Sequence, residues 1–78
     1  MRVSDILEIE CKIMERGNHS IEIVDMQGKS LTVKEFSANP EYQTVHNFEI
    51  SVRNFSSGSY IIILHTPTEK YFGKFVKQ

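Results

Sequence analysis

The chain has 78 residues, a formal net charge of -1 and 40% hydrophobic residues, which fits one small domain with a thin core. This composition excludes a disordered chain, because apolar residues are plentiful and the net charge is low. It also argues against a general nucleic-acid-binding domain, which usually carries a basic stripe.

Apolar and polar residues alternate with a period of two along most of the chain, which is typical of strands with one buried face. The first predicted strand spans residues 7–13 and the second residues 21–24, with a turn between them at residues 15–18. Asp25 and Gly28 mark a short hairpin connection, because Gly28 tolerates a positive φ and Asp25 can bond the backbone two residues on. Leu31, Val33 and Phe36 then belong to the return strand.

A stretch without periodicity at residues 37–43 divides the predicted strands into two groups. Pro40 has no backbone N–H and favours extended geometry before it, so we expect a crossover from one sheet to the other. The unbroken apolar run at residues 60–64 predicts a central strand covered on both faces. The last strand is expected to be interrupted at Gly73 and Lys74. After the crossover, the predicted strands are residues 47–52, 60–64 and 71–76, with turns at residues 54–58 and 66–69.

Strands at this spacing, with turn signals between them and no helical periodicity, predict an all-β fold. We expect an Ig-like or fibronectin-like sandwich of two antiparallel sheets, with about six or seven strands, formed by residues 1–78 as a single domain. An exposed strand edge in such a sandwich would allow a homodimer to form by β-pairing.

Residue types that carry catalysis or bind metals are scattered along the sequence. His19, expected in a turn, and His46 and His65, expected in strands at the rim, lie in different segments without metal-ligand spacing. Cys11 falls on the apolar face of the first strand and is interpreted as a small buried hydrophobe. Nucleophile elbows, phosphate-binding glycine loops and paired carboxylates are missing from the sequence. We therefore predict no enzyme activity, with no catalytic residue, no metal site and no cofactor.

The aromatic residues leave one alternative open. Most of them should lie in the core, because so small a domain needs their apolar area there. An exposed subset would form a platform for sugar or peptide, so a carbohydrate- or protein-binding sandwich module is the alternative function. The aromatic residues are Phe36, Tyr42, Phe48, Phe55, Tyr60, Tyr71, Phe72 and Phe75.

Three stretches, at residues 21–31, 48–64 and 70–77, together resemble the C-terminal sorting domain of the type IX secretion system of Bacteroidetes bacteria. That family shows a strand, an Asp-x-x-Gly hairpin, a second strand, a Leu/Phe-x-x-Gly-x-Tyr element, a hydrophobic strand and a Lys-rich final strand. Phe55, Gly58 and Tyr60 match the Gly-x-Tyr element. Residues 3–7 also resemble the opening strand of the family. One departure is that Met1-Arg2 stands where the family usually has Asn-Pro.

The resemblance implies a secretion signal and not a catalyst. Such a tail directs an attached N-terminal cargo protein across the outer membrane, and a sortase-like peptidase then removes it. The cargo is secreted or displayed on the cell surface, where it is often attached to lipopolysaccharide. We expect a tail excised from a larger secreted protein, with the signal peptide on the full-length cargo, since the N-terminus here has no apolar leader.

The implied partners are a receptor of the secretion machinery, the sortase and the cargo domain, with no nucleic acid. A basic terminal strand offers a charged handle and a strand edge for a receptor. The residues expected to contact the receptor are Lys70, Lys74, Lys77 and Gln78, and those of the structural motif are Asp25, Gly28, Gly58 and Tyr60.

Overall fold

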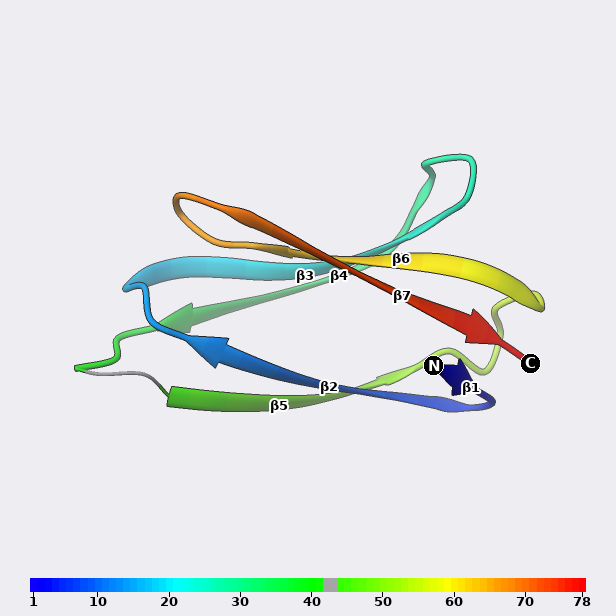
Figure 1. The fold of residues 1–78 in the computed structure, drawn as a ribbon, viewed down its shortest axis with the longest axis horizontal. Coiled ribbons are helices and arrows are strands. Elements are labelled where there is room, and N and C mark those ends of the chain that lie inside the picture. The colour runs from blue at the N-terminus through cyan, green and yellow to red at the C-terminus, as the bar shows by residue number, and fades with distance from the viewer. Residues whose placement is uncertain (42–43) are drawn as a thin grey trace.

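The computed structural model describes residues 1–41 and 44–78, and every regular element in this part of the chain is a β-strand. The strands form two layers, a five-stranded sheet in the order β1-β7-β6-β3-β4 and a two-stranded sheet of β2 and β5 (Figure 1). This arrangement confirms the predicted all-β sandwich. The strands are β1 (Arg2–Val3), β2 (Ile6–Ile13), β3 (Gly17–Asp25), β4 (Ser30–Ala38), β5 (Thr44–Ser51), β6 (Gly58–His65) and β7 (Lys70–Lys77).

The core lies between the two sheets and is built by the period-two alternation seen in the sequence. In β2, Leu7, Cys11 and Ile13 are buried while Glu8, Glu10 and Lys12 are exposed. Because alternate side chains point to opposite faces of a strand, one face of β2 packs on the larger sheet. The largest fully buried side chains are Phe75, Leu7, Ile13, Ile21, Ile23 and Val52.

The β3–β4 hairpin forms as the turn chemistry predicts. The Asp25 carboxylate accepts hydrogen bonds from the backbone N–H groups of Gln27 and Lys29, each at 2.9 Å. Gly28 has a φ of 85°, a left-handed conformation that glycine adopts without steric cost. These contacts fix the register of β3 on β4, so the predicted hairpin is confirmed.

The crossover between the sheets is also confirmed, since β4 belongs to the larger sheet and β5 to the smaller. β4 extends to Ala38, further into the non-periodic stretch than the sequence indicated. Tyr42, one of the candidate aromatic residues, and the end of the crossover lie outside the described residues.

Two expectations for the C-terminal strands are wrong. β7 runs without interruption through Gly73 and Lys74, because Gly73 pairs with Ile62 and Lys74 with Ile61 in a regular ladder. β6 is central in its sheet, as predicted, but only its inner face is covered. Ile61 and Ile63 lie on the outer face and remain partly exposed. The apolar run therefore reflects a central position within the sheet and not burial between two layers.

The first strand of the family pattern is divided between the sheets. β1 pairs in parallel with the end of β7, and after Ser4 and Asp5 the chain enters β2 of the other layer. The backbone N–H of Val76 donates to the Met1 carbonyl, and that of Gln78 donates to the Val3 carbonyl, both at 2.9 Å. This β1 clasp (Arg2–Val3 on Val76 and Lys77) brings both ends of the described chain together (Figure 1). In the described residues, no helix is long and apolar enough to cross a membrane.

Candidate recognition surface

The glycine and tyrosine of the Gly-x-Tyr element position the final strand. Gly58 has a φ of 147° at the start of β6, in a region that residues with a Cβ rarely adopt. Tyr60 is buried, donates its hydroxyl to the Ser56 carbonyl, and stacks on Phe75 with 5.4 Å between ring centroids. Since Tyr60 is also the register partner of Phe75, the motif holds β7 in place through both backbone and ring contacts.

The four predicted receptor-contact residues do not share one face of the protein. Lys70 and Lys74 are exposed on the outer face of the larger sheet, whereas Lys77 lies on the inner face and is 8% exposed. The Lys77 ammonium group donates to the Gln78 carbonyl at 3.1 Å. Gln78 is exposed, but its backbone N–H is held by β1. The structure thus places Lys70 and Lys74 on the same face of β7 and Lys77 on the other.

Phe72 was among the candidate aromatic residues but not among the expected receptor contacts, and it lies between the two exposed lysines in β7. Its side chain is 68% exposed on the outer face of β7. Lys70, Phe72 and Lys74 therefore form a continuous basic and aromatic surface along the last strand, which we call the β7 strip. The sequence could have identified the β7 strip if residues 70–77 had been treated as one uninterrupted strand, because alternate residues of a strand share a face.

Among the aromatic residues that the structure describes, the exposed ones do not form a single flat platform. Tyr71 and Phe72 are 57% and 68% exposed, but as neighbours in a strand they point to opposite faces of the sheet. Tyr60 and Phe75 are buried, and Phe36, Phe48 and Phe55 pack partly buried against the core. This arrangement gives no specific support to the carbohydrate-binding alternative.

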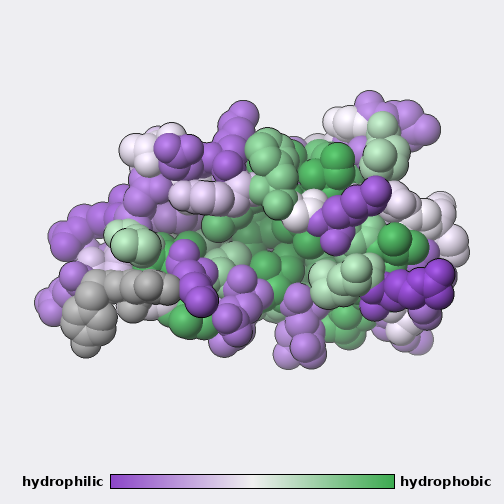
Figure 2. Space-filling view, in the orientation of Figure 1, coloured by the Kyte–Doolittle hydropathy of each residue, from purple (hydrophilic) through white to green (hydrophobic). Residues whose placement is uncertain are grey.

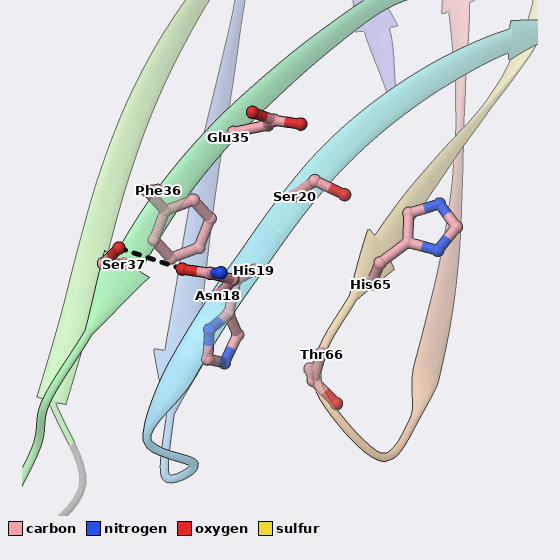
Figure 3. Close-up of a pocket in the computed structure, with 8 residues that line it drawn as sticks. All are labelled: Asn18, His19, Ser20, Glu35, Phe36, Ser37, His65 and Thr66. Atoms are coloured by element: carbon pink, nitrogen blue, oxygen red, sulfur yellow. Dashed lines mark hydrogen bonds between the residues drawn. The ribbon is translucent and has the colours of Figure 1, made fainter.

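The expectation that His19 lies in a turn is wrong, because β3 begins at Gly17 and places His19 in the sheet at 3% exposed. Its Nδ1 lies 2.9 Å from the Gly17 carbonyl, and its ring stacks on Phe36 (Figure 3). The other ring nitrogen, Nε2, is buried and has no hydrogen-bond partner among the described residues. The adjacent cavity of about 380 Å³ is also lined by His65, which stands on β6.

These histidines do not assemble a metal site in the described part of the chain, where no cluster of three or more His, Cys, Asp or Glu residues could hold an ion. Cys11 is 6% exposed, as predicted for a buried hydrophobe. Burial raises the pKa of the Cys11 thiol above its ordinary value, which disfavours the thiolate that a nucleophile requires.

A partly buried contact joins β3 to β6 on the outer face of the larger sheet. His65 Nε2 lies 2.9 Å from the Glu22 carboxylate, and this hydrogen bond holds the pKa of Glu22 below its ordinary value of 4.5. A carboxyl with a lowered folded-state pKa stabilises the fold above its unfolded pKa, and this contribution is lost as the pH falls.

We therefore expect the Glu22→Gln variant to be less stable than the wild type at neutral pH, with the difference shrinking as the pH falls below 4.5. Urea unfolding midpoints measured between pH 7 and pH 3 would check this. Glu35→Gln, an exposed carboxylate on β4, is the control and should keep the pH profile of the wild type. A gap for Glu22→Gln that is constant with pH would contradict the prediction.

The fold is a β-sandwich of a five-stranded and a two-stranded sheet, and its last strand carries exposed lysines. Comparison with family models matches residues 3–78 to the secretion system C-terminal sorting domain, and the chain belongs to this family, that of type IX secretion. No curated protein and no solved structure gives a significant match. The family consists of sorting signals and not of known enzymes, and its members are attached to secreted or cell-surface cargo that the type IX machinery exports.

Proposed function

We propose that the domain directs an attached N-terminal cargo protein across the outer membrane, that a receptor of the type IX machinery reads its terminal strand, and that a sortase-like peptidase then removes it. A signal peptide on the full-length cargo would direct the preceding step. The observation that carries the receptor proposal is the β7 strip, where Lys70 and Lys74 flank the exposed Phe72. Aromatic rings are enriched at protein interfaces, and exposed charges steer a partner of opposite charge and favour it over others.

Lys77 contributes to this proposal in another way. Its side chain is buried against the end of the fold, so we assign it the role of anchoring the C-terminus beside β1. Gln78 remains an exposed candidate for direct contact at the tip of the strand.

The test is export of a reporter fused before residue 1, in a bacterium that has this secretion pathway. We expect the double variant Lys70→Glu with Lys74→Glu to reduce surface delivery roughly tenfold or more, because each substitution replaces attraction by repulsion at the interface. Delivery is measured by labelling the reporter on intact cells.

The matched control is Arg16→Glu with Lys29→Glu, which makes the same change in net charge at two exposed turn residues. Normal delivery of the control and loss in the strip variant would support the proposal. Equal delivery by both variants would show that the receptor does not read the β7 strip. Deleting residues 74–78 is a weaker test, because it also removes Phe75 from the core.

A further inference from the structure

The smaller sheet leaves one side of the sandwich open. Within residues 1–41 and 44–78, β2 pairs only with β5, and a groove of about 490 Å³ lies between its other edge and the inner faces of β6 and β7. Figure 2 shows hydrophobic side chains gathered in a hollow between the two layers. Tyr71, on the inner face of β7, is 57% exposed, because no strand of the smaller sheet covers it.

The walls of this groove are apolar and leave room for added side chains. Ile9, Cys11 and Ile13 line it from β2, while Ile62, Leu64, Tyr71 and Gly73 line it from the larger sheet. A Cβ added at Gly73 would meet only the Ile62 Cβ, at 3.9 Å. Gly73 therefore leaves a notch in the floor of the groove.

The register of β2 on β5 determines which backbone groups face the groove. The backbone N–H of Val52 donates to the Asp5 carbonyl at 2.8 Å, one step beyond the register pair of Ile6 with Ser51. Hydrogen-bonded positions alternate in antiparallel pairs, so the odd-numbered residues of β2 bond to β5. The N–H and C=O groups of Glu8, Glu10 and Lys12 consequently point to the free edge.

The charges along this edge favour a basic partner. Glu8 lies directly opposite Glu49 in the β2–β5 pair, a like-charge arrangement that destabilises a sheet. Glu10 adds a third carboxylate on the same face, and none of the three forms an ion pair within the described residues. A lysine or arginine on a strand added beside β2 would relieve this repulsion, and an acidic residue would suit Lys12.

We propose that this groove binds one extended segment of another polypeptide, which adds to β2 as a third strand. The segment would place small apolar residues in the groove at alternate positions and basic residues opposite Glu8 and Glu10, in the manner of β-augmentation. Only the origin of the bound segment depends on the proposed function: if that function is correct, the segment belongs to a component of the secretion machinery. It assigns the machinery a second contact, separate from the β7 strip.

A second copy of this chain fits the groove less well. If two copies paired through β2, the β6 and β7 strands of each would have to occupy the space over the partner's β2. The inner faces of β6 and β7 of the same chain already lie over the free edge of β2, so the two pairs of strands would collide. A single peptide strand meets no such obstacle.

The probe is the peptide acetyl-Ser-Glu-Val-Lys-Val-Lys-Val-Ser-amide, which in antiparallel register sets its lysines against Glu10 and Glu8 and its glutamate against Lys12. We expect titration into the isotope-labelled domain to shift the amide resonances of β2 and of Gly73. The charge-reversed peptide, acetyl-Ser-Lys-Val-Glu-Val-Glu-Val-Ser-amide, should bind roughly tenfold more weakly.

Two variants make this test specific. Glu10→Pro removes an N–H from the free edge while leaving the bonds from β2 to β5 in place, and should abolish peptide binding. Glu8→Lys with Glu10→Lys should reverse the preference between the two peptides. Glu35→Lys, at an exposed strand position on the other sheet, is the control and should bind like the wild type.

Shifts confined to β2 and β7 that are lost in a folded Glu10→Pro domain would support the inference. It is overturned if the peptide shifts other strands, if the folded Glu10→Pro domain binds equally well, or if sedimentation shows that the free edge is closed by self-association. These measurements use the domain alone. If the wild-type domain fails to export a reporter, that result counts against the proposed function. Whether a strand adds to β2 is decided separately, by the peptide titration.

Discussion

Replacing Phe75 by alanine is expected to lower the free energy of unfolding by about 3–5 kcal/mol, which is the usual range for removing a fully buried aromatic ring. Phe75 is 0% exposed and stacks on Tyr60, so the substitution leaves a cavity where the last strand meets the core. A domain of this size has a total stability of about 4–12 kcal/mol. We therefore expect much of the Phe75→Ala population to unfold at 37 °C, with export of an attached reporter reduced accordingly.

The same strand provides the control for this prediction. Phe72→Ala removes a ring that is 68% exposed and should change the free energy of unfolding by less than about 0.5 kcal/mol. Chemical denaturation of both variants measures the difference. If the two cost the same, β7 is not oriented with Phe75 inward. If Phe72→Ala impairs export while keeping its stability, the effect belongs to recognition by the β7 strip.

The second large effect is expected at Leu7, the residue of β2 that is 0% exposed against the larger sheet. Leu7→Ala should cost about 2–5 kcal/mol, the range for a leucine whose site cannot collapse around the cavity. Because the smaller sheet has only two strands, we expect the loss to loosen the whole layer and not only one position. Hydrogen exchange of the β2 and β5 amides would report this loosening.

Ile6 is the matched control, since it is adjacent to Leu7 and 47% exposed on the opposite face. Ile6→Ala should leave exchange in β5 close to that of the wild type. If Leu7→Ala were to speed exchange only at its own neighbours, the two strands of the smaller sheet would not act as one cooperative unit.

The strands and the sandwich could be predicted from the sequence because the period of two is strong and the turn residues are specific. Leu7 to Ile13 alternate cleanly, and Asp25 with Gly28 defines a hairpin from local contacts alone. Information of this kind is local, so it does not require knowledge of the partner strands. The prediction of a sandwich of about six or seven strands followed from such local features together with the resemblance to the family.

The positions that sequence reasoning missed depend on contacts between distant segments. His19 was placed in a turn, but the pairing of Gly17 with Ala38 extends β3 towards its N-terminus and buries the ring beside Phe36. The outer face of β6 is uncovered because the smaller sheet lies on one side only. Neither fact is encoded in a single segment.

The candidate site was predicted only in part. What was missed is which face of β7 each lysine occupies, and this depends on whether its position in the strand is even or odd. Once β7 is continuous, Lys70 and Lys74 share a face with Phe72, while Lys77 falls on the other. Expecting an interruption at Gly73 removed this constraint and left three lysines that looked equivalent. Glycine is intrinsically unfavourable inside a strand, but at Gly73 the pairing with β6 outweighs this effect.

The β1 clasp has a mechanical consequence. In a parallel pair, tension applied between the start of one strand and the end of the other acts along both strands. The bonds from Val76 to Met1 and from Gln78 to Val3 would then bear the load together in shear, and could not break one after another as in an unzipping hairpin. A machine that pulls the two ends of this domain apart would meet its first resistance there. Tension on the cargo side alone would pull on the same few residues that hold the C-terminal strand in position.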